Sequence, residues 1–261
     1  MDETYQTYLN RVARLTLPAT YQSQVQHIQD SPKFAPHPSG GRKAVPFPGY
    51  TVITPPWEEE AENSALYENL KACQEQLLQQ LDTDLMVPVP ADSFHLTLAD
   101  LIWDGAYSDA VRGNPDFDVQ LRDRIAESFE QCKTSVTGGN PIHWQLLGLI
   151  IMPRAVGVCL LPKHENFYER ILQLRRSIYQ NPGLIALGIE QQYHFTAHIT
   201  LGYFGDIPPE LYRDRLSATL SQLNDQWLDA PQELWIRRAE LRKFDDMTRY
   251  YREPDWPVLE F

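Results

Sequence analysis

Two kinds of apolar pattern alternate along this chain, and together they predict a protein of mixed helices and strands. Apolar side chains recur at helical spacing between Leu66 and Leu81, and the same spacing returns in segments that begin near residues 117, 164 and 216. Short apolar runs between these segments are typical of strands; they cover residues 50–54, 93–98, 142–152, 155–161, 193–203 and 234–244. Because only Pro153-Arg154 separates the third and fourth runs, we expect these two to pair as antiparallel neighbours.

The predicted elements occur in the same order twice. Strand, helix, strand, helix, strand extends over about residues 50–151 and again over 155–243, which is typical of a duplicated unit. We therefore predict an α+β, duplicated two-lobe fold with antiparallel sheets, helices on their outer faces and a cleft on a pseudo-two-fold axis. Residues 1–45 are expected to form an N-terminal arm of one or two helices and a loop rich in Pro and Gly, and residues 46–261 a single bilobal domain.

Each half of the repeated region contains a His-x-Thr segment bounded by apolar residues. The segments are His95-Leu96-Thr97-Leu98 and His198-Ile199-Thr200-Leu201. Because side chains two apart on a strand point to the same face, each segment presents one imidazole and one hydroxyl together. A single triplet is weak evidence, since the chain contains a third, His194-Phe195-Thr196, which has no counterpart in the first half. The matched pair predicts two histidines that face one another across the cleft.

Two imidazoles and two hydroxyls can cleave a phosphodiester without a metal. One histidine, neutral, would take a proton from the attacking water, and the other, protonated, would donate to the leaving oxygen. Thr97 and Thr200 would hydrogen-bond the phosphate oxygens as charge builds on them. The residues alone leave open whether His95 or His198 is the base.

Three alternatives compete with this hypothesis. In the first, each histidine is a half-buried strand residue that is bonded to a neighbour, and in the second the chain is a non-catalytic nucleotide-binding module on the same fold. The third is a metal-dependent hydrolase that uses His194 and His198. Asp100 and Asp104 follow the first motif, but their spacing matches no common zinc pattern. We therefore expect neither a metal nor a cofactor.

Composition and charge narrow the class of partner. The 261 residues are 43% hydrophobic and carry a formal net charge of −12, which argues against tight binding of long nucleic acid but permits a small phosphate ester. The N-terminus is acidic and polar, and no apolar run is long enough to span a bilayer, so we expect neither a secretory signal nor a membrane anchor. Three separated cysteines, Cys73, Cys132 and Cys159, are expected to be reduced, buried thiols of a cytoplasmic protein.

The paired His-x-Thr-apolar segments resemble those of the two-histidine (2H) phosphoesterase superfamily. This superfamily includes RNA 2′,3′-cyclic phosphodiesterases, plant-type cyclic phosphodiesterases and bacterial branches of unassigned substrate. The stretch from Pro46 to Ile53 and the closing Phe244-Asp245-Asp246-Met247 resemble one of the unassigned bacterial branches. The resemblance covers roughly residues 45–261 and is more specific for the superfamily than for a substrate.

The resemblance implies that His95 and His198 are the catalytic pair and that Thr97 and Thr200 hold the phosphate. Several RNA-directed members have a basic residue where this chain has Tyr203, and Asp100 follows the first motif, so a tRNA-end substrate is disfavoured. We expect Tyr203 to contact the substrate, with Tyr193 and Trp103 as other rings able to stack on a base. Arg42 and Lys43 are candidate cations for the phosphate, although a solvated loop is their simpler interpretation.

Overall fold

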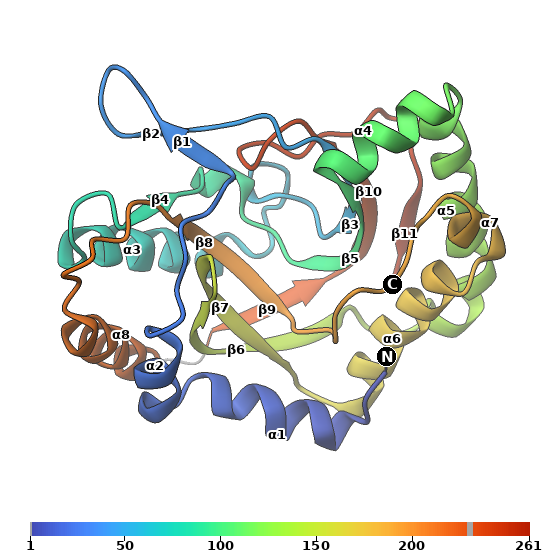
Figure 1. Cartoon of the computed structure of the whole chain (residues 1–261). Coiled ribbons are helices and arrows are strands. Elements are labelled where there is room, and N and C mark those ends of the chain that lie inside the picture. Colours follow the sequence, from blue (N-terminus) through green and yellow to red (C-terminus); the bar gives the residue numbers. More distant parts are fainter. Residues whose placement is uncertain (1, 229–231) are drawn as a thin grey trace.

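The computed structural model describes residues 2–228 and 232–261, and two antiparallel sheets form its centre (Figure 1). The first sheet has the order β11-β10-β3-β5 and consists of β3 (Gly49–Ile53), β5 (Thr97–Trp103), β10 (Arg238–Phe244) and β11 (Val258–Glu260). The second has the order β4-β8-β7-β6-β9 and consists of β4 (Met86–Pro88), β6 (Ile142–Met152), β7 (Ala155–Pro162), β8 (His198–Phe204) and β9 (Glu233–Ile236). The α+β class predicted from the sequence is therefore confirmed.

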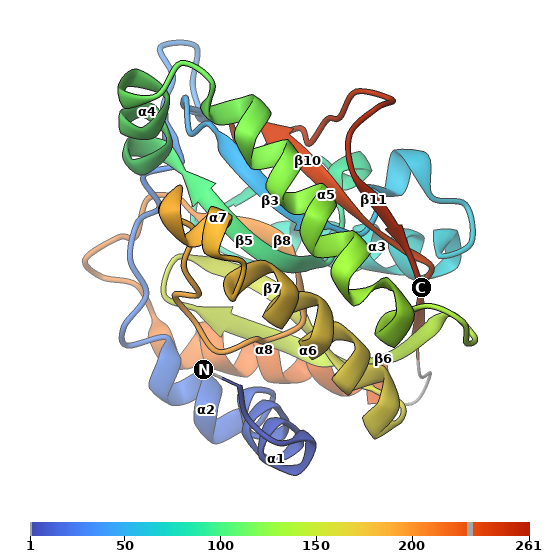
Figure 2. The same cartoon turned by 90° about the vertical axis from the view of Figure 1, so that its right-hand side faces the viewer.

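Helices cover the two sheets from opposite sides. On one side α5 (Phe117–Val136) and α6 (Glu165–Tyr179) lie next to each other, with the short α7 (Pro182–Ala186) packed against both (Figure 2). On the other side lie α3 (Ser64–Gln80) and α8 (Arg213–Leu228) (Figure 1). The apolar stripe of α3 is buried, as its spacing predicts, and the stripes of α5 and α6 are buried in the same way. None of the helices in the described part of the chain has the length and apolar character that crossing a membrane requires.

The two sheets do not follow the two sequence halves, because some strands of each half pair in the other sheet. β4 of the first half, for example, pairs with β8 in the second sheet. β6 belongs to the first half but pairs with β7 and β9 in the second sheet. β10 belongs to the second half but pairs with β3 in the first sheet. The tight turn at Pro153-Arg154 makes the β6–β7 hairpin the expected antiparallel pair, and this hairpin is confirmed. The sheets therefore differ from the lobes predicted over 50–151 and 155–243.

The N-terminal arm contains the two helices that the sequence suggests, and they are part of the main core. These helices are α1 (Tyr5–Leu15) and α2 (Pro18–Gln24). Tyr8 and Tyr21 are fully buried, and their hydroxyls donate to the carbonyls of Leu160, 3.0 Å away, and Leu149, 2.6 Å away. The arm is thus tied to both β7 and β6. Tyr8, Val12, Tyr21, Val25 and Ile28 of the arm are part of the main hydrophobic core.

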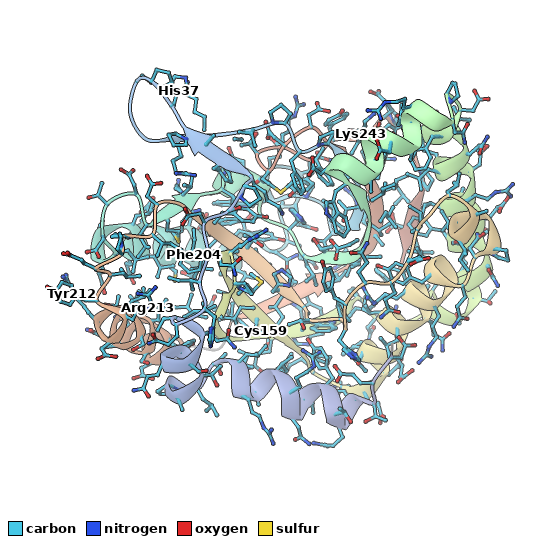
Figure 3. All side chains as sticks on the ribbon, in the orientation of Figure 1. His37, Cys159, Phe204, Tyr212, Arg213 and Lys243 are labelled. Atoms are coloured by element: carbon cyan, nitrogen blue, oxygen red, sulfur yellow. The ribbon has the colours of Figure 1, made fainter. Side chains whose placement is uncertain are left out.

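Several local elements differ from the predictions. The Pro- and Gly-rich loop contains a hairpin of β1 (Phe34–Pro36) and β2 (Arg42–Ala44), with His37 at its projecting end (Figure 3). A helix that the sequence reading missed, α4 (Asp104–Gly113), follows β5, and two 3₁₀ turns occur as η1 (Trp57–Glu59) and η2 (Ala91–Ser93). Both motif strands also begin later than predicted. The reason for β5 is that its partner β3 ends at Ile53, which lies opposite Thr97.

Candidate active site

The two motif histidines lie at equivalent places at the entrances of their strands. His95 comes two residues before the first residue of β5, and His198 is the first residue of β8. In both, ring atom Nδ1 lies 2.7 Å from the carbonyl oxygen of the residue two positions earlier, Ser93 or Thr196. Because a carbonyl only accepts, each Nδ1 is the donor, and a neutral ring keeps its other nitrogen, Nε2, unprotonated. Both histidines are thus oriented with Nε2 available for proton transfer.

A β-bulge interrupts each motif strand at the same motif position. The pairing of β5 with β3 passes from Thr97 to Ala99, and the pairing of β8 with β7 passes from Thr200 to Gly202. The extra residue is the leucine that follows the threonine in both cases. A bulge inverts the alternation of side chains, so the residue five positions after each histidine joins the face of the motif. These residues are Asp100 and Tyr203, and both line the same cavity as the histidines.

The five predicted site residues meet in one cavity of about 950 Å³. It is lined by His95, Thr97, His198, Thr200 and Tyr203. Its volume lies within the range of about 300–1,000 Å³ that is typical of small-molecule sites. No hydrogen bond of the Thr97 or Thr200 hydroxyl, or of either histidine Nε2, occurs within the described residues. The polar atoms that a phosphate would need are thus free to bind a ligand.

The first motif is held by the segment that follows β3. The hydroxyl of Thr54 accepts a hydrogen bond of 3.0 Å from the amide of Leu96, and the Thr54 amide donates to the Leu96 carbonyl at 3.0 Å. The amide of Trp57 donates to the carbonyl of Phe94 at 2.9 Å. Residues on both sides of His95 are therefore fixed by the segment that follows β3.

The second motif is held by the N-terminal arm. The Tyr8 hydroxyl accepts from the amide of Ala197 at 3.2 Å, and Arg11 donates to the Thr196 hydroxyl at 2.7 Å and to the Phe195 carbonyl at 2.6 Å. Thr196 also provides the carbonyl that orients His198. The helix α1, which lay outside the region of family resemblance, thus positions one of the two histidines.

The environment of His95 favours its neutral form. Burial of the ring lowers its pKa to about 4, and the nearby His198 and Arg242 act in the same direction, against an opposing hydrogen bond to Ser93. The ring of Tyr250 lies against it, with 4.3 Å between centroids. Sequence reasoning missed Tyr250, because nothing in the pattern of the C-terminal segment shows that it returns to the first motif.

Arg175 is a second residue of the site that sequence reasoning missed. It is only 5% exposed, lines the cavity and forms no ion pair within the described residues. Its Nη1 donates to the Leu98 carbonyl at 2.6 Å, and its guanidinium lies 4.8 Å from the ring centroid of Phe195, so it contacts the first motif and the segment that precedes the second. Its Nε has no hydrogen-bond partner in the described part of the chain. Its position on the apolar face of the 164–179 helix could have identified it from the sequence, because a charged side chain is rarely buried without a partner.

The other predicted cations lie elsewhere. Arg42 forms an ion pair with Asp206 and donates to the Phe34 carbonyl at 2.8 Å, while Lys43 is exposed on β2, and neither lines the cavity. A different basic residue, Lys33, lies in the cavity wall beside Tyr203, with 3.2 Å between its Nζ and the tyrosine hydroxyl. Lys33 from the N-terminal segment thus places a cation beside Tyr203, the position at which several RNA-directed 2H phosphoesterases have a basic residue.

The other residues named as possible stacking rings or metal ligands also line the cavity. Trp103, Asp100 and Asp104 line it on the side of the first motif, and Tyr193 and His194 line it from an exposed, irregular segment before β8. His194 therefore does not share a strand face with His198. Within residues 2–228 and 232–261 no group of three or more His, Cys, Asp or Glu side chains is arranged to hold a metal ion.

Comparison with known proteins identifies a related family and a related fold. Residues 37–110, which include the first motif, match the family described as "2H-phosphodiest: Domain of unknown function (DUF1868)". The chain is similar in structure to a conserved protein of unknown function, ATU0111 from Agrobacterium tumefaciens, at a TM-score of 0.60 and 18% identity. That similarity covers 89% of this chain and 96% of the other, and it shows that the fold is shared. No curated protein matches the sequence.

Two further solved structures are more distant. TT0787 of Thermus thermophilus is 17% identical at a TM-score of 0.44, with 81% of this chain and 94% of that chain covered. LigT of E. coli, solved in complex with 3'-AMP, is 15% identical at a TM-score of 0.43, with 80% of this chain and 97% of that chain covered.

Proposed function

We propose that this chain is a metal-independent phosphodiesterase of the 2H phosphoesterase superfamily, and the family match at residues 37–110 supports this. Its substrate would be a small cyclic phosphate of the 2′,3′-cyclic type or a short oligonucleotide. The observation that carries the proposal is the equivalence of the two motifs. His95 and His198 have the same Nδ1 contact, line one cavity, and are each accompanied by a threonine hydroxyl without a partner among the described residues.

His95 is the base in this proposal and His198 the acid. A lowered pKa keeps the His95 ring neutral at pH 7, and Nε2 can then take a proton from water as its oxygen attacks phosphorus. The bound phosphodiester anion opposes the desolvation of His95 and raises its pKa toward the working pH. His198 donates the Nε2 proton to the ribose oxygen as the ester P–O bond breaks. The products are a phosphate monoester and a free hydroxyl, and solvent returns the proton from His95 to His198.

The threonines and Arg175 would stabilise the phosphate. The Thr97 and Thr200 hydroxyls lie two residues after the histidines and can donate to the non-bridging oxygens, whose charge grows in the transition state. The guanidinium of Arg175 has no carboxylate partner among the described residues and lines the cavity between the first motif and Phe195. Its charge therefore lowers the cost of bringing an anion into the cavity. A local positive field of this kind offsets the negative charge of the whole chain.

A small nucleotide is the substrate class that the cavity favours. Its volume of about 950 Å³ suits a nucleotide or dinucleotide, and the rings of Trp103, Tyr203 and Tyr250 in its wall can stack on a base. The net charge of −12 disfavours a long nucleic acid. We also propose a cytoplasmic location, which the buried, free thiols of Cys73, Cys132 and Cys159 support.

The proposal is tested by hydrolysis in the absence of free metal. Purified protein is incubated in EDTA with 2′,3′-cyclic nucleotides, 2′–5′-linked dinucleotides and cyclic dinucleotides, beside His95→Ala, His198→Ala and the control His27→Ala. His27 is exposed and does not line the cavity. We expect turnover that resists EDTA and falls by about 10²- to 10⁴-fold in the two motif variants only.

Three results would contradict it. Full turnover in either motif variant would overturn the paired acid–base mechanism. Turnover that EDTA abolishes and divalent cations restore would favour a metal-dependent hydrolase, and loss of this turnover in His194→Ala would assign His194 as a ligand. Binding of nucleotides without turnover of any substrate would favour the non-catalytic module.

A further inference from the structure

Lys33 is a cation in the cavity wall without a carboxylate partner in the described part of the chain. It is half-buried, and no Asp or Glu among the described residues forms an ion pair with it. Its Nζ donates to the Tyr203 hydroxyl at 3.2 Å and lies 4.7 Å and 4.8 Å from the ring centroids of Tyr203 and Phe47. An ammonium group has three donors, and this contact uses one of them. The other two are available for a ligand.

The wall around Lys33 is aromatic and lies against a second apolar cluster. Phe34, Phe244 and Met247 form a second apolar cluster, and Phe47, Trp103, Tyr203 and Tyr250 pack against it. The Tyr203 hydroxyl also lies 3.4 Å from the Met247 sulfur, so the position of this ring is fixed by contacts at its hydroxyl. A charge that is only partly solvated beside fixed aromatic rings attracts an anion more strongly than a charge in open water does.

Lys33 is also separated from the position of the scissile phosphate. Tyr203 follows Thr200 by three residues on β8, an advance of about 7–10 Å along the strand, and Lys33 contacts the hydroxyl at the end of the Tyr203 side chain. The distance corresponds to the length of a nucleoside placed between two anionic groups.

We infer that Lys33 forms a second anion subsite and that the substrate carries a phosphate monoester in addition to its scissile diester. The inference rests on the proposed function, because the scissile group is placed between His95 and His198. The rings of Phe47 and Tyr203 then flank the terminal phosphate, and the nucleoside spans the wall between the two phosphates. A nucleoside 2′,3′-cyclic phosphate with a 5′-phosphate is the simplest molecule of this chemistry.

Binding and hydrolysis test the subsite separately. Affinities for 3′-AMP and for adenosine 3′,5′-bisphosphate are measured by calorimetry, and hydrolysis is measured with adenosine 2′,3′-cyclic phosphate with and without a 5′-phosphate. The variants are Lys33→Met, which keeps the aliphatic stem between the two rings, and Lys33→Arg. The control is Lys43→Met, because Lys43 carries the same charge on the exposed face of the neighbouring hairpin.

We expect the unmodified protein to bind the bisphosphate about tenfold more tightly than the monophosphate, which is the gain of one charge-assisted hydrogen bond. Lys33→Met should lose this preference and keep its affinity for 3′-AMP, while Lys33→Arg and Lys43→Met should retain the preference. The KM values of the two cyclic substrates should follow the same pattern.

Failure of the subsite and failure of the proposed function give different results. If the unmodified protein shows no preference for the second phosphate, or if Lys33→Met and Lys43→Met lose it equally, the subsite is refuted even though hydrolysis continues. If no cyclic substrate is hydrolysed but the preference in binding depends on Lys33, the phosphodiesterase is refuted and the subsite stands.

Discussion

The two His-x-Thr segments are built alike but supported differently. Both have a histidine bonded through Nδ1 to a carbonyl two residues earlier, a threonine hydroxyl without a partner among the described residues, and a bulge at the next leucine. The first is fixed by Thr54, which directly follows β3 of the same sheet. The second is fixed by Tyr8 and Arg11, from a helix near the start of the chain. A duplicated site can thus keep its geometry although its supports diverge.

The fifth residue after each histidine also distinguishes the two sides of the cavity. It is Asp100 in the first motif, an exposed acid, and Tyr203 in the second, a ring that accepts a hydrogen bond from Lys33. One wall of the cavity is therefore acidic where the other is aromatic and cationic. The two histidines have the same Nδ1 contact, and the proposed mechanism gives them different roles because burial lowers the pKa of His95.

The largest effect is expected from changing the leaving group in the two histidine variants. His95→Ala and His198→Ala should each lose about 10²- to 10⁴-fold in kcat with a ribose leaving group. With a nucleoside p-nitrophenyl phosphodiester, which leaves without protonation, the loss in His198→Ala should shrink to less than about tenfold, while His95→Ala stays impaired. Steady-state kinetics with both substrates measures this difference. Rescue of His95→Ala instead would reverse the two roles.

A smaller and symmetric effect is expected from the threonines. Thr97→Val and Thr200→Val keep the size of the side chain and remove the hydroxyl donor, so kcat should fall by about 10²-fold in each variant. Thr134→Val, on an exposed residue of α5, is the matched control. A fall in only one of the two motif variants would show that the phosphate is bound by one motif alone.

The lowered pKa of His95 predicts a pH dependence of both activity and stability. Because the base is neutral down to about pH 4 in the free protein, the acid limb of kcat/KM that belongs to His95 should lie near pH 4 instead of near 6.5. The unfolded chain binds a proton at its histidine near pH ~6.5, so the free energy of unfolding should decrease as the pH falls from about 6.5 to about 4. Denaturant unfolding of His95→Gln, in which this contribution is absent, measures it.

The smallest effect is expected from substitution of the residues that bond the backbone beside each motif. Tyr8→Phe and Thr54→Val each remove an acceptor for a backbone amide beside one motif, which should cost about 1–3 kcal/mol of stability. The imidazole NMR signals should separate the two variants: Tyr8→Phe should shift those of His198, and Thr54→Val those of His95. Equal shifts of both histidines in both variants would contradict the independent support of the two motifs.

Part of this architecture could be predicted from local sequence patterns. The apolar stripes of α3, α5 and α6 and the β6–β7 hairpin depend on residue spacing within one segment. They can therefore be predicted from the sequence. The exchange of β6 and β10 between sheets could not be predicted, because pairing across sheets depends on which edges become available once the hairpin has formed. The bulges in β5 and β8 could not be predicted for a similar reason, because a residue is extra only in relation to the strand with which it pairs.

The sequence by itself determined the candidate groups of the site, two histidines and two threonines at matched positions, and most of the helices and strands around them. Only the tertiary structure decided what surrounds these groups. Tyr250, Arg175 and Lys33 reach the cavity from distant segments, and the arm of residues 1–45 reaches the second motif. The physical reason is that burial, pKa and unpaired charge depend on which side chains pack together, and local spacing carries no information about such contacts.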